Sequence, residues 1–265
     1  MRTANSKTLG GPGLSTRIRC LIFSLIYGCQ LSTVVVASEV LLFGTLDLAP
    51  LALDQNGNGN RGFITDIHHA ISDKSQIAIA NEVLPLARLM KHLKKGSIDC
   101  AVFIRSPWSE QTFFPVAEVI PDFDSVIITS KNLKINRLTD LHGKLLAIPR
   151  GSFPQLPVST DPNILRFFTN GYTQSTRLLK YGRVDAIAGN ALSLFYNLET
   201  MQLGPDEIGT ILTFDHQPLW LHCRKNRLSR KIVSRLRVAT DFLRNEGVFQ
   251  RMLDNYTPAN YLVSE

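Results

Sequence analysis

An arginine and a tryptophan follow an apolar run of the sequence, and together they could hold a small polar molecule. The run Cys100–Ile104 has the composition of a strand that is covered on both faces. Arg105 follows it directly, and Trp108 comes three residues later. In open α/β sheets, ligands are held at the carboxyl ends of strands, so both side chains are candidate ligand contacts. A surface salt bridge for Arg105 and plain packing for Trp108 are the simpler alternatives.

Two further strand ends carry polar residues. The apolar run 145–148 leads into a turn that holds three more candidate contacts: Arg150, Gly151 and Ser152. A Gly-Ser turn after a strand can offer backbone N–H groups and a hydroxyl to an anion, and it can equally be an ordinary turn. Asn190 stands at the end of another apolar run, where a helix is expected to begin.

Two near copies of one pattern position these residues. Leu93–Asp99 and Leu179–Asp185 both read Leu-Lys-x-Gly-x-(Ile/Val)-Asp, and each precedes an apolar run. The pattern predicts the last turn of a helix, then Gly96 or Gly182 at positive φ, then a buried strand. The copies are too far apart for a solenoid repeat and have about the spacing of two similar α/β lobes. Such junctions also recur in unrelated α/β proteins.

The periodicity of apolar residues predicts the remaining elements. Thr65 or Asp66 is expected to cap a helix that runs through Ile71. Short helices are expected over 164–168 and 173–180, and a strongly periodic one from Leu228 to Asn245. The order of elements predicts an α/β protein with mixed, mostly parallel sheets.

The first 37 residues predict an exported protein. Arg17 and Arg19 precede an uncharged stretch from Cys20 to Ala37, which favours a secretory signal peptide over 1–37 that is cleaved near Ala37. A retained membrane anchor and lipid attachment at Cys29 are the alternatives. The chain is exported in all three cases, and we expect a periplasmic location.

Composition excludes several classes of protein. With 44% hydrophobic and 19% charged residues, the chain is neither disordered nor fibrous. The net charge of +7 is weak evidence for nucleic-acid binding, because four basic residues lie in the expected signal peptide: Arg2, Lys7, Arg17 and Arg19. The sequence has no cysteine or histidine cluster at metal-ligand spacing, so we expect no metal and no cofactor. Cys100 and Cys223 remain after cleavage, and whether they pair stays open.

In this order, the motifs resemble the amino-acid-type periplasmic solute-binding proteins of ABC transporters (family 3 solute-binding proteins). The resemblance covers 39–258 and rests on six segments: Asp47–Leu51, Gly62–Ile67, Leu93–Asp99, Asp140–Lys144 with Gly151-Ser152, Gly182–Ala186 and Asn245–Phe249. It implies a type II periplasmic binding fold, in which a two-stranded hinge joins two α/β lobes. The expected lobes are 38–121 with 216–265, and 122–215.

The same resemblance implies two ligand anchors, and this chain departs from both. The family binds the ligand carboxylate with an arginine in a Thr-x-x-Arg-like segment, where this chain has Gln111 at the matched position. The family binds the ammonium group with an aspartate, and Asn190 stands at that position here. The loss of both charges argues against a standard free amino acid as ligand, with Arg105 or Arg150 as candidate substitute anion anchors.

The sequence therefore predicts a monomeric, non-catalytic protein that captures a small polar ligand between its lobes, with an ABC transporter as the expected partner. Asp47 and Phe123 complete the candidate ligand contacts, with Phe153 as a further stacking face. A sensor that feeds a membrane receptor is the first alternative, and a lyase on the same fold is the second. A lyase needs a titratable group in the cleft, and the available carboxylates are more simply caps or rim charges.

Overall fold

The computed structural model describes residues 40–53 and 61–261. The expected signal peptide, its cleavage near Ala37 and the alternative lipid attachment at Cys29 lie outside these ranges. No helix within the described ranges is long and apolar enough to cross a membrane.

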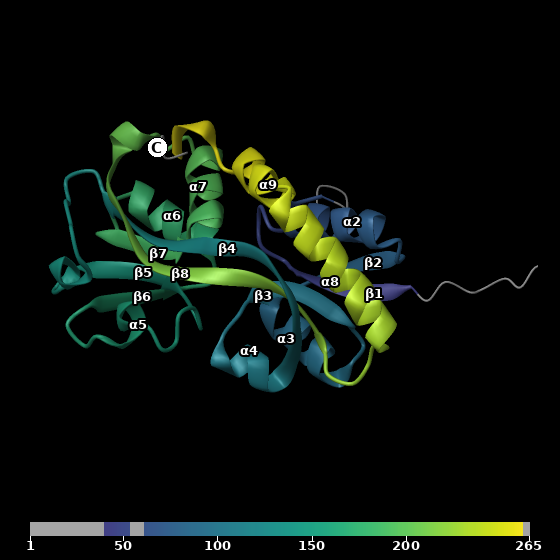
Figure 1. Cartoon of the computed structure of the whole chain (residues 1–265). Helices are drawn as coiled ribbons and strands as arrows, with labels where there is room; N and C mark the ends of the chain where they lie inside the picture. The colour runs from purple at the N-terminus through teal and green to yellow at the C-terminus, as the bar shows by residue number, and fades with distance from the viewer. Residues whose placement is uncertain (1–39, 54–60, 262–265) are drawn as a thin grey trace, which may run out of the picture. The chain divides into compact units, whose positions relative to one another are not determined.

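The described strands form one mixed sheet in the order β2-β1-β3-β8-β4-β7-β5-β6. Their bounds are β1 Leu41–Leu46, β2 Ile79–Leu84, β3 Cys100–Ile104, β4 Phe113–Ser130, β5 Leu145–Pro149, β6 Leu165–Thr169, β7 Ala186–Asn190 and β8 Ile208–Arg224. The two long strands β4 and β8 are antiparallel partners and run through both halves of the sheet (Figure 1). The predicted fold class, two α/β halves joined by two strands, is confirmed.

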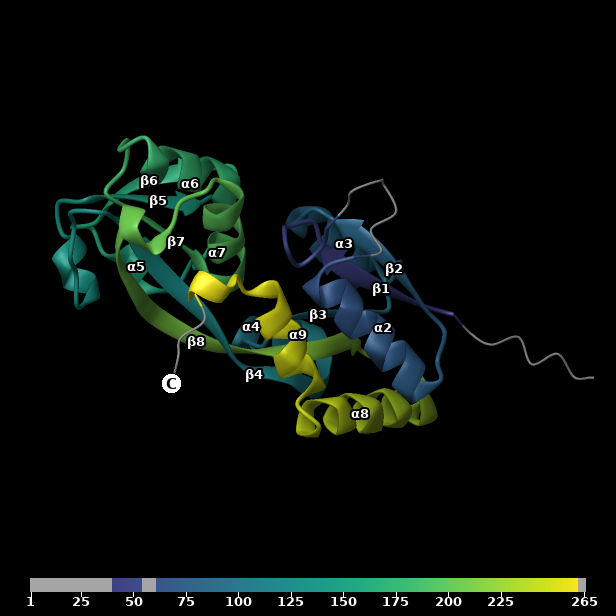
Figure 2. The ribbon, with the colours of Figure 1, turned by 90° about the horizontal axis from the view of Figure 1, so that it is seen from above.

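Helices cover both faces of the first half of the sheet, which holds β1, β2 and β3. On one face, Phe43 and Val102 pack in a core with three helices: α2 (Phe63–Ser75), α8 (Arg230–Asn245) and α9 (Val248–Tyr256). Their sequence neighbours Leu42 and Phe103 belong to a second cluster with α3 (Leu86–Lys95). Successive strand residues point to opposite faces, which explains why these strands are apolar throughout. Figure 2 shows α3 on one side of the strands and α2 with α8 on the other.

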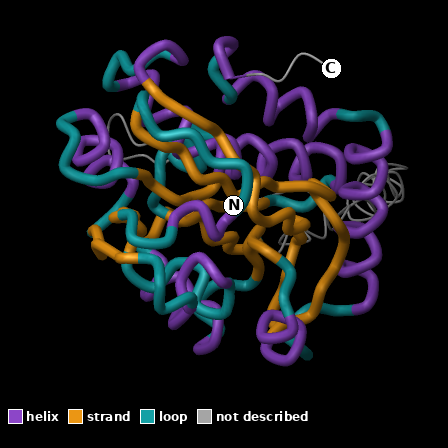
Figure 3. Tube along the Cα trace, turned by 90° about the vertical axis from the view of Figure 1, so that its left-hand side faces the viewer, coloured by secondary structure: helices purple, strands orange, loops and turns teal. Residues whose placement is uncertain are grey.

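The second half repeats this arrangement around β5, β6 and β7. Ala147 and Ile187 pack in one core with α6 (Tyr172–Lys180) and α7 (Ala191–Thr200). Leu146 and Ala188 pack in another core with the short α5 (Pro157–Thr160). Helices on both sides of the strands are visible in Figure 3. The remaining helical turns are α4 (Pro107–Thr112), η1 (Leu138–Leu141), η2 (Pro205–Glu207) and η3 (Ala259–Tyr261).

The two sequence repeats adopt the same backbone conformation and make the same type of hydrogen bond in the two halves. Both glycines have positive φ, 80° at Gly96 and 61° at Gly182, as predicted. The Asp99 carboxylate accepts the backbone N–H of Leu42 at 3.0 Å, and the Asp185 carboxylate accepts that of Leu145 at 2.7 Å. Each aspartate therefore ties the start of one strand to the neighbouring parallel strand, at the end of the sheet opposite to the carboxyl ends.

Cys100 and Cys223 form a disulfide bond, which answers the question that the sequence leaves open. They are opposite residues of the antiparallel strands β3 and β8, with Cα atoms 4.0 Å apart, and both are buried. The bond joins residues that are 123 positions apart in the sequence.

Two local predictions are wrong. Residues 165–169 form the edge strand β6, paired in parallel with β5, and no helix covers 164–168. Its aromatic residues favour a strand, and tertiary pairing decides between the two. Helix α2 begins at Phe63 after Gly62, so neither Thr65 nor Asp66 caps it. Glycine is required at the cap, because a Cβ on Gly62 would lie 2.6 Å from the Ala52 Cα.

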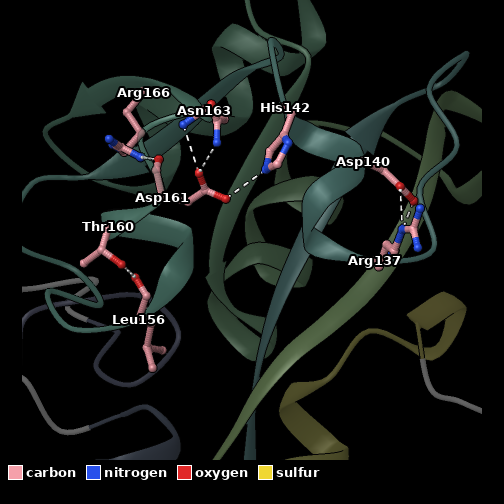
Figure 4. Close-up of polar contacts among 8 residues, drawn as sticks. All are labelled: Arg137, Asp140, His142, Leu156, Thr160, Asp161, Asn163 and Arg166. Carbon is pink, nitrogen blue, oxygen red and sulfur yellow. Dashed lines mark hydrogen bonds and ion pairs between the residues drawn. The ribbon is translucent and has the colours of Figure 1, made fainter.

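Polar contacts fix the loop between α5 and β6, which the sequence shows only as a polar segment. The Asp161 carboxylate contacts His142 Nε2 at 2.9 Å and accepts the backbone N–H of Asn163 at 2.9 Å (Figure 4). The hydrogen bond from Asn163 is the main cause that lowers the pKa of Asp161, and His142 adds to it. The Arg166 guanidinium donates to the Asp161 carbonyl at 2.6 Å. These contacts hold the exposed loop against the sheet.

Candidate functional site

The carboxyl ends of the two half-sheets lie beside the same short stretch of β4 and β8. Ile104, the last residue of β3, is opposite Leu219 of β8, which is opposite Ile120 of β4. A few residues further along β4, Ser125 is opposite Asn190, the last residue of β7. We call residues 120–125 of β4 and 215–219 of β8 the crossover.

The parallel strands extend this arrangement. β1 is parallel to β3, and β5 is parallel to β7, so their carboxyl ends lie at the same edges of the sheet. Asp47 follows β1, is exposed, and donates its N–H to the carbonyl of Leu84. Arg105 follows β3 and donates its N–H to Pro218 of the crossover at 2.9 Å. The topology thus brings predicted contacts from both halves to one region.

The Arg105 side chain already has two partners. Its Nε forms an ion pair with Glu110, and its guanidinium lies 4.1 Å from the centre of the Trp220 ring. The side chain is 36% exposed. Arg105 therefore forms a surface salt bridge, which is the simpler alternative that its sequence context allows. Because the side chain is accessible, its remaining guanidinium N–H groups can still donate to a ligand.

The half-buried Trp220 and the buried His222 lie close to this arginine. Trp220 Nε1 is buried and has no hydrogen-bond partner among the described residues. The fully buried His222 bonds through Nδ1 to the Trp220 carbonyl at 3.0 Å and stacks on Phe103 at 4.1 Å. Burial lowers the pKa of His222 to about 4, so this ring is neutral at physiological pH.

In the second half, Ser152 and Asn190 are brought together by a tyrosine that the sequence did not single out. The Tyr172 hydroxyl accepts the Asn190 N–H at 3.2 Å and its side-chain amide at 3.3 Å. The Ser152 side chain is also hydrogen-bonded to Tyr172, whose pKa is raised by burial. Gly189 is the feature of the sequence that could have indicated this tyrosine, because a Cβ at that position would lie 2.2 Å from the Tyr172 ring.

Asn190 also has a structural role. Its side-chain oxygen accepts the N–H of Ser193 at 2.8 Å and caps α7. The amide oxygen accepts one hydrogen bond in the cap and the amide nitrogen donates one to Tyr172, which leaves one acceptor site and one N–H for a ligand. Arg150 and Gly151 are exposed on the neighbouring turn, and Gly151 has a φ of 80°.

A row of polar residues crosses the sheet at the crossover. Asn190 of β7 is opposite Ser125 of β4, which is opposite Asp215 of β8. Ser125 Oγ and Asp215 Oδ2 are both buried without a hydrogen-bond partner in the described part of the chain. Desolvation raises the pKa of Asp215. Buried polar atoms without partners are costly, so this pair is a strong candidate for ligand contact.

Asp215 is not among the ligand contacts predicted from the sequence, because it lies inside a long strand with many apolar residues. The signal that marks it is the polar pair Asp215-His216 within β8, since His216 Nδ1 contacts the Asp124 carboxylate at 2.8 Å across the crossover. A carboxylate whose pKa is raised by desolvation is a candidate functional group.

Three predicted contacts do not reach this region freely. The carbonyl of Gln111 accepts Lys225 Nζ at 2.6 Å, just beyond β8 and at the end of the sheet opposite to the crossover. Trp108 packs edge-on against Phe113 near that same end. Phe123 lies in the crossover, but it is only 5% exposed and belongs to the core, so its ring is not available for stacking on a ligand.

Ser106 and Ser109, which precede Gln111, have structural roles in α4. Ser106 caps α4, and Ser109 occupies the third helical position, with reciprocal side-chain to backbone hydrogen bonds of 3.2 and 2.8 Å. Ser109 is completely buried. Neither these serines nor Gln111 carries a guanidinium. No group of three histidine, cysteine or acidic residues that could hold a metal ion occurs in 40–53 and 61–261.

Comparisons with known proteins place the fold. No family model matches the chain, and no curated protein matches its sequence significantly. The substrate-binding protein of an amino acid ABC transporter is similar in structure, with a TM-score of 0.65, 18% identity and coverage of 82% of this chain and 99% of that one. The chain has the type II periplasmic binding fold.

Two other similar structures are a sensor domain and a ligand-binding core. A histidine kinase sensor domain with similarity to periplasmic binding proteins has a TM-score of 0.67 at 15% identity, and it covers 82% of this chain and 95% of that one. The GluR0 ligand-binding core from Nostoc punctiforme, in complex with L-glutamate, has a TM-score of 0.66 at 19% identity, with coverage of 82% and 98%. Transport and sensing proteins thus share this fold.

Proposed function

We propose that this chain is an exported, non-catalytic binding protein that captures a small polar solute at the crossover. The observation that carries the proposal is the convergence of both half-sheets on a row that contains buried, unpartnered polar atoms, Ser125 Oγ and Asp215 Oδ2. A ligand that hydrogen-bonds to these atoms removes their desolvation cost, and such a gain favours binding.

The proposed lobes are 38–121 with 216–265, and 122–215, so that the hinge lies within the crossover. Two register shifts in the β4–β8 pairing support this position, because they fall between Ile120 and Phe123 and between Ser125 and Val126. Bulges weaken regular pairing and let a strand bend. Closure of the lobes over the solute would bring Asp47 and Arg105 toward Arg150 and the Gly-Ser turn.

The proposed solute carries a hydrogen-bond donor or cationic group for Asp215 and an anionic or acceptor group for Arg105 or Arg150. A standard amino acid held in the family's way is not expected, because Gln111 and Asn190 stand where the family has an arginine and an aspartate, so both charged anchors are absent. Selectivity then depends on a few directed contacts in a desolvated site.

The proposed location of this chain is the periplasm, in line with the expected signal peptide. Its proposed partner is a membrane transporter. The similarity to a histidine kinase sensor domain favours a second candidate, in which a membrane receptor recognises the closed form. Both partners would act on the same liganded state.

A thermal-shift screen of the secreted protein tests the binding function. The library contains amino acids, peptides, organic acids, polyamines and sugars. A solute at 100 times its dissociation constant should add about 2.7 kcal/mol of stability. A positive result with standard amino acids only would contradict the expected ligand class. Conversion of a bound solute, detected by mass spectrometry, would contradict the non-catalytic assignment.

Asp215→Asn is expected to weaken binding of the solute about 10- to 100-fold, because the substitution removes a charged hydrogen-bond partner. The free protein should keep its stability at neutral pH. In the unmodified protein, the folded-state pKa of Asp215 lies above the ordinary value of 3.8. The protonated carboxyl therefore contributes to the free energy of unfolding below pH 3.8, and this contribution is lost as the pH rises through the folded-state pKa. Calorimetric titration together with urea denaturation measures both effects.

Arg150→Ala and Arg183→Ala form a matched pair for the same titration. Both arginines are exposed and lie in the second half, but Arg183 lies before β7, at the opposite edge from Arg150. Loss of a guanidinium contact should weaken binding about tenfold in Arg150→Ala only. Equal effects in both variants would show that Arg150 acts through general charge.

A further inference from the structure

A hollow beside α8 is lined by basic, polar and apolar residues. Its volume is about 450 Å³, and its lining includes three arginines, Arg224, Arg230 and Arg237, together with the polar side chains of Asn226 and Ser234. Its other lining residues are apolar: Phe114, Cys223, Leu228 and Val233. We call it the α8 hollow. No acidic residue belongs to this lining.

The α8 hollow is separate from the crossover. It lies where β8 ends, at Arg224, opposite Phe113 at the start of β4, whereas the crossover uses Asp215–Leu219. In Figure 1 the chain passes from this end of β8 through a loop into α8. A ligand in the hollow would therefore leave the proposed solute site free.

Positive charge is concentrated in this segment. Residues 224–237 contain seven lysines and arginines and no acidic residue, while the net charge of the whole chain is +7. Arg227 is the one member of this run with an ion pair in the described ranges, to Asp99 at 3.4 Å, and it does not line the hollow. The positive potential at the hollow is thus largely uncompensated.

None of the three lining arginines forms an ion pair within the described ranges, and backbone carbonyls hold two of them. Arg237 Nε donates to the Val116 carbonyl at 2.9 Å, and its guanidinium lies 6.0 Å from the Phe114 ring. Arg224 Nη1 donates to the Lys95 carbonyl at 3.5 Å. Arg230 makes no side-chain hydrogen bond or ion pair with the described residues. Carbonyl partners orient a guanidinium but leave its charge available to an anion.

We propose that the α8 hollow binds a phosphate group. A phosphate offers several acceptor oxygens and more than one negative charge, which suits the guanidinium groups of Arg230 and Arg237 in the lining, since the Arg224 guanidinium packs against Gly96 at the end of α3. The apolar lining suits an organic substituent on that phosphate. The group could belong to a free phosphorylated solute or to a phospholipid headgroup, and the chemistry of recognition is the same.

Calorimetry and vesicle flotation with the purified secreted protein test this proposal and distinguish the two sources. Pyrophosphate is the free probe. Vesicles of phosphatidylglycerol and phosphatidylcholine are the lipid probe, with pure phosphatidylcholine vesicles as reference. Binding of pyrophosphate alone assigns a free phosphorylated solute, and flotation only with the anionic vesicles assigns a lipid headgroup.

Arg230→Gln and Lys231→Gln are the matched variants. Both positions are exposed, lie in the first turn of α8 and lose one positive charge, but only Arg230 lines the hollow. Arg230→Gln should weaken binding of the active probe at least fivefold, and Lys231→Gln less than twofold. The proposal is overturned if neither probe binds the unmodified protein, or if both variants weaken binding equally.

Discussion

Replacing both Cys100 and Cys223 with alanine is expected to lower the free energy of unfolding by about 2 to 5 kcal/mol. The disulfide closes a long loop, since its cysteines are 123 positions apart, and the chain-entropy estimate for such a loop is about 5 kcal/mol. At roughly 2 to 4 °C per kcal/mol for a domain of this size, the melting temperature should fall by about 5 to 15 °C.

Reduction of the unmodified protein is the control for this change. Both sulfur atoms stay in the buried core after reduction, so the loss that it causes reports the crosslink, and the additional loss in the alanine variant reports packing. Scanning calorimetry with and without reductant measures both. A variant whose melting temperature stays within about 1 °C of the parent would contradict a stabilising crosslink.

Acidification from pH 7 to pH 5 is expected to cost about 4 kcal/mol of stability through two buried histidines. Burial lowers the pKa of His68 and of His222 to about 4, from an ordinary value of 6.5. Below pH 6.5 the unfolded chain binds protons that the folded chain does not, so stability falls as pH drops toward 4. Each histidine contributes about 2 kcal/mol by pH 5.

The surroundings of His68 explain its low pKa. Its Nδ1 lies 3.0 Å from the side-chain oxygen of Asn81, and its ring packs edge-on against Phe43. Its Nε2 is buried with no hydrogen-bond partner in the described residues, so a second proton would add an unsatisfied charged donor. The same reasoning applies to Nε2 of His222.

His68→Gln and His69→Gln test this assignment by urea denaturation at both pH values. His68→Gln should remove about half of the pH dependence, whatever its effect on stability at pH 7. His69 is the neighbouring exposed residue, and its charge is the smallest of the causes that act on the pKa of His68, so its replacement should change the pH dependence much less than His68→Gln does. A pH dependence that survives intact in His68→Gln would assign the acid sensitivity to other groups.

The fold could be predicted from the sequence because a few positions tolerate few alternatives. Gly96 and Gly182 need positive φ, and the aspartates Asp99 and Asp185 each bind a backbone N–H of the neighbouring strand. These constraints are local, so they are visible in the sequence as a repeated pattern. The apolar runs that follow require helices on both faces, and this requirement fixes the fold class.

The site was harder to predict because its geometry depends on pairing between distant strands. Asp215 and Ser125 become neighbours only when β4 pairs with β8, and Tyr172 meets Asn190 only when α6 packs on β7. The match of Gln111 to the family's arginine stays a prediction, because the structure shows only that the Gln111 carbonyl accepts Lys225 Nζ.

Aromatic residues were the least predictable. Phe123 follows Pro121 and Asp122 in the sequence and looked accessible, yet it stacks on Phe63 in the core, with ring centres 6.4 Å apart. Which face of a bulged strand an aromatic residue takes depends on the register shifts around it, and these are not encoded in a short window of sequence.

Hydrogen–deuterium exchange with and without the best solute tests the central claim most directly. We expect the solute to slow exchange in both halves at once, over 47–50 and 105–109 in one half and over 150–153 and 190–193 in the other. Protection confined to one half, or found instead at 224–237, would contradict capture of the solute at the crossover.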